Sequence, residues 1–187
     1  MAMRRDVGAK GTRAKPQAAA ARVAACGLAL VGILASTAHA DHWPRHTIDN
    51  TSRGADGVRM MDVNGDGHLD IATGWEEGGV IRVYLNPGHG KSKAPWPAVT
   101  VGRVKSAEDA VFVDLDQDGA VDVVSSCEGG TRTMYVHWAP KDKANYLDEN
   151  AWTTEPIPAT AGKQLWMFCL PMQIDGKHGP DLIVGSK

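Results

Sequence analysis

The sequence has few long hydrophobic stretches, and its one extended apolar run without charge is Val23–Leu34. These twelve residues are too few to cross the hydrocarbon core of a bilayer, so a transmembrane anchor is not expected. Basic residues are scarce after residue 40, where 14 Lys and Arg face 21 Asp and Glu. An acidic body argues against general binding to nucleic acid, which requires a basic surface.

Helix-forming sequence is also sparse after residue 40, whereas 21 Gly and 10 Pro punctuate the chain. Short runs of Val, Ile, Thr, Met and Tyr between such residues are typical of a turn-rich β protein. Hydrophobic residues make up 43% of the chain, which is ordinary for a globular domain. Disorder of the whole chain is therefore not expected.

Cysteine is rare, with three residues in the whole chain. Cys26 lies in the apolar run, so Cys127 and Cys169 are the two that concern the rest of the protein. In an oxidising compartment these two could form a disulfide bond. They could equally be two separate, buried, small apolar side chains, and the sequence leaves both possibilities open.

Residues 1–40 have the three parts of a secretory signal peptide. Basic residues from Arg4 to Arg22 precede the apolar run, and Ala38-His39-Ala40 supplies small residues before Asp41. This order predicts cleavage after Ala40 and secretion of a soluble chain to an extracellular or periplasmic compartment. No membrane span is expected in the mature chain.

The rest of the chain, residues 41–187, repeats itself. Segments led by tryptophan begin at Trp43, Trp96 and Trp152. Each is followed by an acidic element, and these begin at Asp62, Asp114 and, in a degenerate copy, Gln173. The expected repeat units are residues 43–95, 96–151 and a truncated unit, 152–187.

Each unit carries short strand patterns, and the first contains four of them, at residues 45–48, 58–63, 69–75 and 80–85. Four antiparallel strands in about 50 residues form the blade of a β-propeller. The predicted fold is therefore all-β, a propeller of four-stranded antiparallel blades, with about three blades in this chain and the last one incomplete. A β-sandwich with accidental internal symmetry is the alternative.

The acidic element reads Asp-x-Asn/Asp-x-Asp-Gly-x-x-Asp between two strands, at residues 62–70 and 114–122. This motif resembles the FG-GAP/VCBS repeat, although the literal Phe-Gly and Gly-Ala-Pro signature is absent. The resemblance covers Trp43 to the C-terminus and implies a β-propeller like those of secreted bacterial proteins and integrin α-chain heads. Fewer than three blades cannot close such a ring, which needs at least about four. Further blades are therefore expected beyond the C-terminus or from another copy.

The two complete acidic elements are each expected to bind one structural Ca²⁺. Alternate side chains of a tight turn project oxygen atoms, the carbonyl of the seventh residue adds another, and Ca²⁺ takes about six to eight oxygens. The expected ligands in the first element are Asp62, Asn64, Asp66, Asp70 and the carbonyl of His68. Those in the second are Asp114, Asp116, Asp118, Asp122 and the carbonyl of Ala120.

The acidic elements have two other possible interpretations. An EF-hand is excluded, because its twelfth position is Thr73 or Ser125 where Glu is required, and the flanks are strands. A metal-free turn stays possible, because Asp, Asn and Gly favour turns unaided. In the third element Lys177 takes the fifth position, and its ammonium group is expected to replace the cation.

The loops at the other end of the strands offer candidate ligand contacts at Glu76, Glu128 and Arg132. Loops on a rigid scaffold concentrate binding function, and such side chains suit a polar ligand such as a sugar. A solvated rim of internal salt bridges is the alternative.

The expected function is a secreted, calcium-stabilised module that binds a glycan or a protein. The second hypothesis is a carbohydrate-active enzyme, either a lyase, a dehydratase or a hydrolase, with its site at the mouth of the propeller. No catalytic residue is assigned, because the sequence carries no Gly-x-Ser-x-Gly element, phosphate loop or His-Glu-x-x-His motif.

Overall fold

The computed structural model describes residues 43–187, which contain ten strands and three short 3-10 helices. The expected signal peptide, residues 1–40, lies outside the described residues. Within the described part of the chain, no helix has the length and apolar character that a membrane crossing requires.

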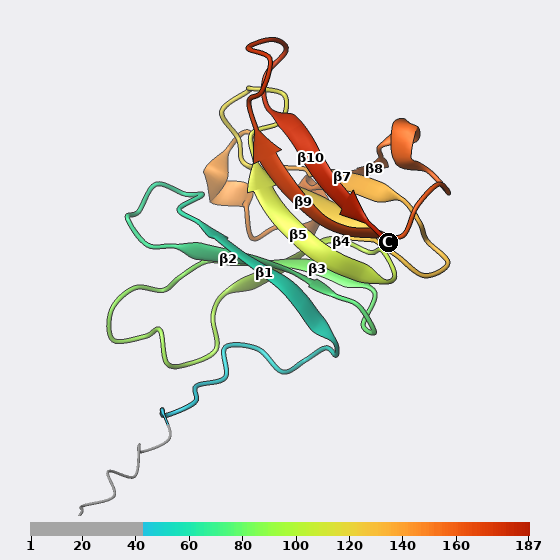
Figure 1. Cartoon of the computed structure of the whole chain (residues 1–187). Coiled ribbons are helices and arrows are strands. Elements are labelled where there is room, and N and C mark those ends of the chain that lie inside the picture. Colours follow the sequence, from blue (N-terminus) through green and yellow to red (C-terminus); the bar gives the residue numbers. More distant parts are fainter. Residues whose placement is uncertain (1–42) are drawn as a thin grey trace, which may run out of the picture. The chain divides into compact units, whose positions relative to one another are not determined.

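The strands form three antiparallel sheets in which neighbours follow chain order (Figure 1). Sheet one contains β1 (Ala55–Met61), β2 (Asp70–Trp75), β3 (Val80–Tyr84) and β4 (Ala98–Gly102). Sheet two contains β5 (Ala107–Val113), β6 (Asp122–Cys127), β7 (Met134–Trp138) and β8 (Thr153–Pro156). Sheet three contains β9 (Trp166–Met172) and β10 (Asp181–Ser186). The all-β prediction is confirmed, and the four-stranded sheets are consistent with propeller-like blades.

The three 3-10 helices lie in the connections on either side of β8. They are η1 (Lys143–Asn145), η2 (Glu149–Ala151) and η3 (Pro158–Thr160). Asp142 and Asp148 cap η1 and η2, each accepting a bond from a backbone N–H two residues ahead. Such Asp side chains favour the start of a helical turn because they satisfy an N–H that has no partner within the helix.

The sheets do not begin where the sequence repeat begins. The segments after Trp96 and Trp152 pair with the strands before them, so that β4 closes sheet one and β8 closes sheet two. The segment 45–48 forms no strand, and that prediction was wrong. Each of these two segments pairs with the third strand of the sheet that comes before it in the chain. The described residues contain no sheet before β1, so the segment after Trp43 has no such strand to pair with.

Strand β5 lies between β1 and β9, and its two faces enter two separate cores (Figure 1). Ala110 and Phe112 are buried with residues of sheet one, whereas Val111 and Val113 are buried with Cys169 of sheet three. Because successive side chains of a strand point to opposite faces, this alternation lets a single strand join three sheets.

Close approach of β1 to β5 depends on Gly57. A Cβ at this position would lie 2.5 Å from the Cα of Asp109, closer than any real contact. Gly57 also has φ of 55°, a left-handed conformation that other residues rarely adopt. Any side chain at position 57 would therefore push β1 of sheet one and β5 of sheet two apart.

The two cysteines of the described chain are separate, buried thiols. Cys127 belongs to the core that contains residues of sheets one and two, and Cys169 belongs to the core between sheets two and three. Burial raises the pKa of each thiol to about 12. Of the two possibilities that the sequence left open, the structure therefore has the unbridged one.

The carboxylate of Asp109 on β5 connects all three sheets. It accepts two bonds from Arg59 of β1, at 3.0 Å from Nε and 2.7 Å from Nη2. The backbone N–H of Cys169 on β9 donates to it at 3.1 Å. Asp109 is only 1% exposed, so these partners replace the water that it loses on folding.

We expect the Arg59→Met variant to lose about 3 kcal/mol of unfolding free energy, because it leaves a buried carboxylate without its countercharge. Arg103→Met is the matched control, since Arg103 also pairs with a carboxylate at 2.7 Å, that of Glu149, but both side chains are exposed. The control should lose less than about 1 kcal/mol. Urea unfolding measures both, and equal losses would contradict the bridging role of Asp109.

His137 on β7 is a second buried polar group. Its Nε2 lies 3.0 Å from the hydroxyl of Ser125, and its Nδ1 lies 2.8 Å from that of Thr154. Burial lowers the pKa of the imidazole from 6.5 to about 3. His137 therefore stays neutral in the folded protein at pH values where it is protonated in the unfolded chain.

We expect acid to destabilise the protein through His137. Between pH 6.5 and about 3 the unfolded chain binds a proton that the folded chain does not. The unfolding free energy should therefore fall by up to about 1.4 kcal/mol for each pH unit below 6.5. Urea unfolding at pH 7 and pH 5 tests this, with His137→Gln as the variant whose pH dependence should be smaller. The same slope in both proteins would exclude His137 as the source.

Candidate functional site

The three acidic elements form the loops that join the first two strands of each sheet. We call residues 62–70 loop one, 114–122 loop two and 173–181 loop three. In loop one the carboxylate of Asp62 accepts bonds from the N–H groups of Gly65, Asp66 and Gly67, at 2.8 to 3.1 Å. In loop two Asp114 does the same for Asp118 and Gly119. The first acidic residue of each loop thus organises the turn.

The third and fifth positions of both loops also accept backbone bonds. Asn64 and Asp116 each accept from the N–H two residues ahead, at 2.9 and 3.1 Å. Asp66 and Asp118 accept from the N–H groups of His68 and Ala120, both at 2.8 Å. The third and fifth positions therefore accept the same backbone hydrogen bonds in both loops.

The ninth residue, Asp70 or Asp122, is buried at the start of the second strand, with 0% and 2% of its surface exposed. One oxygen accepts from the N–H seven residues earlier, and the other accepts from the N–H just after the third strand. Burial raises the pKa of Asp70, and it raises that of Asp122 to about 6, with Asp116 and Asp118 adding to the effect. Such carboxylates are costly to ionise unless positive charge lies nearby.

Loop two brings three of its carboxylates together. Asp114, Asp116 and Asp122 each have an oxygen within 4.8 Å of the others. Asp118 turns one oxygen toward Lys141, 3.5 Å from its Nζ. In loop one the Asn64 amide donates to Asp66 at 3.0 Å. Three close oxygens without a countercharge among them form a group that could hold a divalent cation.

Loop three differs at its first position, where Gln173 replaces aspartate. Its amide oxygen accepts from the N–H of Gly176 at 2.8 Å, as the first aspartate does in loop one. Its amide nitrogen donates to the carbonyls of Lys177 and Gly179, the fifth and seventh residues of the loop. Lys177 is exposed, like most residues of the loop, and the expectation that its ammonium group replaces the cation stays a prediction. The Gln173 amide reaches these carbonyls because Gln173 is the first residue of the same tight loop.

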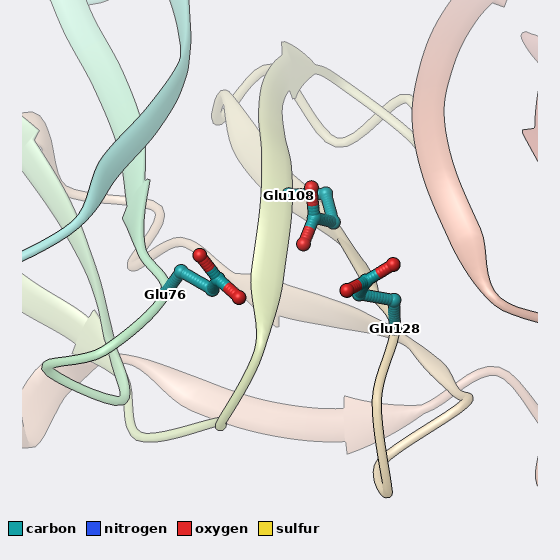
Figure 2. Close-up of side chains that lie close together, drawn as sticks. All are labelled: Glu76, Glu108 and Glu128. Atoms are coloured by element: carbon teal, nitrogen blue, oxygen red, sulfur yellow. The ribbon is translucent and has the colours of Figure 1, made fainter.

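At the opposite end of the strands, the carboxyl groups of Glu76, Glu108 and Glu128 turn toward one another (Figure 2). Burial raises the pKa of Glu108, and the neighbouring Glu128 and Glu76 raise it further. Lys187 lies 2.7 Å from Glu128 and supplies one positive charge. The structure thus brings together the two glutamates that the sequence singled out.

Sequence reasoning missed Glu108, the third member of this group. It stands 52 residues after Asp56, which is the same spacing as between the acidic loops, and an acidic residue recurring at that spacing was the available signal. Arg132 takes a different direction, because its guanidinium donates to the carbonyl of Lys163 at 2.8 Å. The backbone N–H of Arg132 donates to the carbonyl of Glu128 at 3.1 Å, but no hydrogen bond found among residues 43–187 joins the Arg132 side chain to the three glutamates.

A hollow of about 560 Å³ on sheet one was not expected from the sequence either. It is lined by the segment 47–51, by Arg82, by Trp96 and by part of the β7–β8 connection. Arg82 is already engaged there, bonding Asp49 at 2.5 Å and lying 5.7 Å from the ring centre of Trp75. This hollow lies at the β4 edge of sheet one, and none of the expected site residues line it.

Comparison with known families gives one match. Residues 62–125 match the model of the FG-GAP-like repeat, so the matched segment contains loops one and two in full. A search of the curated proteins gives no match.

Proposed function

We propose that this chain is part of a secreted β-propeller whose loops one and two each bind a structural Ca²⁺, and that the protein serves as a binding module. The observation that carries the calcium proposal is the amide of Gln173. In loop three this amide donates hydrogen bonds to the carbonyls of Lys177 and Gly179, the fifth and seventh residues of the loop. Loops one and two have aspartate at that position, which offers only acceptors, so a cation takes the role of the donor.

The chemistry of loop two supports the choice of metal. Its three convergent side chains offer only carboxylate oxygens, and hard oxygen ligands in an irregular turn suit Ca²⁺ better than the softer transition metals. A divalent cation also offsets the cost of ionising the buried Asp122, whose pKa is raised to about 6. The same ion removes the repulsion between neighbouring carboxylates.

The proposed ions are structural. Each loop joins two adjacent strands, and its ninth residue is bonded to the backbone at the end of a third strand. Binding a cation to this arrangement stabilises the folded sheet, because the ligands are dispersed when the chain unfolds. Calcium at extracellular levels suits the weak sites of secreted modules, in line with the proposed secretion.

The propeller assignment is supported by the serial packing of four-stranded sheets and by the FG-GAP-like repeat at residues 62–125. For the ligand, we propose a glycan or a protein that contacts the end of the strands opposite the calcium loops. The carboxylates of Glu76, Glu108 and Glu128 converge there, and such acceptors suit sugar hydroxyls or basic groups of a protein.

We expect calorimetric titration of the chain with Ca²⁺ to give two sites. Asp66→Ala should remove one and Asp118→Ala the other, whereas Asp175→Ala in loop three is the matched control and should leave both. Calcium at about one hundred times its Kd should add about 2.7 kcal/mol of stability for each site, and EDTA should lower the melting temperature. Unchanged stoichiometry in both loop variants would refute the calcium assignment.

We also expect a glycan array probed with the labelled chain to give signals that Glu76→Gln and Glu128→Gln each reduce at least about tenfold, because each removes a charged acceptor. The control is Glu77→Gln, at the next residue, whose side chain is 60% exposed and lies beside Arg53. A ligand whose binding survives both test variants would place the contact surface elsewhere. An array without any signal would exclude the glycan and leave a protein ligand.

A further inference from the structure

Two apolar surfaces of the described chain are uncovered, one on sheet one and one on sheet three. On β1, Val58 and Met60 are 59% and 61% exposed. On β9, Phe168, Leu170 and Met172 are 47% to 48% exposed. Large apolar side chains gathered on one face of a strand mark an interaction surface.

The two surfaces can be compared with the internal interfaces, because the last three residues of β1, β5 and β9 pair in equivalent registers. Met61, Val113 and Met172 are the last residues of β1, β5 and β9, and each pairs with the ninth residue of the loop that follows it. Counting back from these residues, Met60 is equivalent to Phe112 and Leu170 is equivalent to Val111.

The equivalent residues of sheet two are buried, and they are buried by the neighbouring sheets. Phe112 is 5% exposed and packs toward sheet one, and Val111 is 3% exposed and packs toward sheet three. The outer face of sheet one is therefore the kind of face that docks on a preceding sheet. The outer face of sheet three is the kind that receives a following sheet.

These are the two halves of one heterologous interface, and both are on the same chain. We propose that copies of this chain associate head to tail, with sheet one of one copy packed on sheet three of the next. A heterologous contact of this kind builds rings when the rotation closes and filaments when it does not. The packing would repeat the geometry that already joins sheets one, two and three.

The mixing of two variants tests the proposal. Met60→Glu blocks the outer face of sheet one, and Leu170→Glu blocks that of sheet three; both side chains are exposed, so neither change should disturb the fold of a single chain. Leu147→Glu is the matched control, because Leu147 is 46% exposed and lies on neither strand. Circular dichroism checks the folding of each variant, and Met60→Ser and Leu170→Ser replace any that fails.

Sedimentation velocity over a range of concentrations should give masses above that of one chain for the unchanged protein and for the control. Each test variant alone should sediment as a single chain. An equimolar mixture of the two should give a mass of two chains and none larger, because each retains the face that the other lacks.

Three results would overturn the proposal. An unchanged protein that stays a single chain at all concentrations would mean that the faces are covered otherwise, by another segment of its own chain or by a different partner. A test variant that still dimerises alone would indicate contact between like faces. A mixture that fails to pair would indicate unspecific aggregation of the unchanged protein.

Discussion

The buried carboxylate of Asp109 is the group on which the arrangement of the three sheets depends. It lies on the central strand β5 and takes bonds from β1 on one side and β9 on the other, through Arg59 and the N–H of Cys169. A charge in this place fixes how far the sheets can slide, because any other register leaves a buried carboxylate without partners. The absence of a side chain at Gly57 belongs to the same constraint, since it lets the strands come close enough for the bonds to form.

The acidic loops apply the same chemistry on a smaller scale. Their aspartates first satisfy the N–H groups of a tight turn, and this alone gives the loop its shape. The buried ninth residue of loops one and two then ties the hairpin to the strand beyond it. In loop three, where Gln173 takes the first position, Asp181 accepts the bond within the loop, from the N–H of Ile174. The shape of the turn therefore does not require aspartate at the first position. The amide oxygen of Gln173 accepts the bond that aspartate accepts in loop one, and its amide nitrogen donates to two carbonyls of its own loop.

Much of this could be predicted from sequence, because strands and tight turns leave local signals. The alternation of apolar residues and the spacing of Asp, Asn and Gly placed the strands of sheet one from β1 to β3, together with the loop between β1 and β2. The sheet that each tryptophan-led segment joins could not be predicted in the same way, because a strand pattern does not show which neighbouring strand it pairs with. The group of Glu76, Glu108 and Glu128 was partly missed for a similar reason. Glu108 lies inside a strand. The pairing of β5 with β6 places it near Glu128, but only the packing of sheet two on sheet one brings it beside Glu76.

Each internal interface carries one thiol, and this makes the two interfaces chemically distinguishable. Cys127 is sealed in the core of sheets one and two, and Cys169 is sealed between sheets two and three. With both thiols buried and their pKa values raised to about 12, neither is reactive while the sheets stay packed. Alkylation can then occur only when a sheet opens, and the cysteine that is modified identifies which of the two seams has parted. The protein thus carries its own pair of reporters for stepwise separation of its sheets.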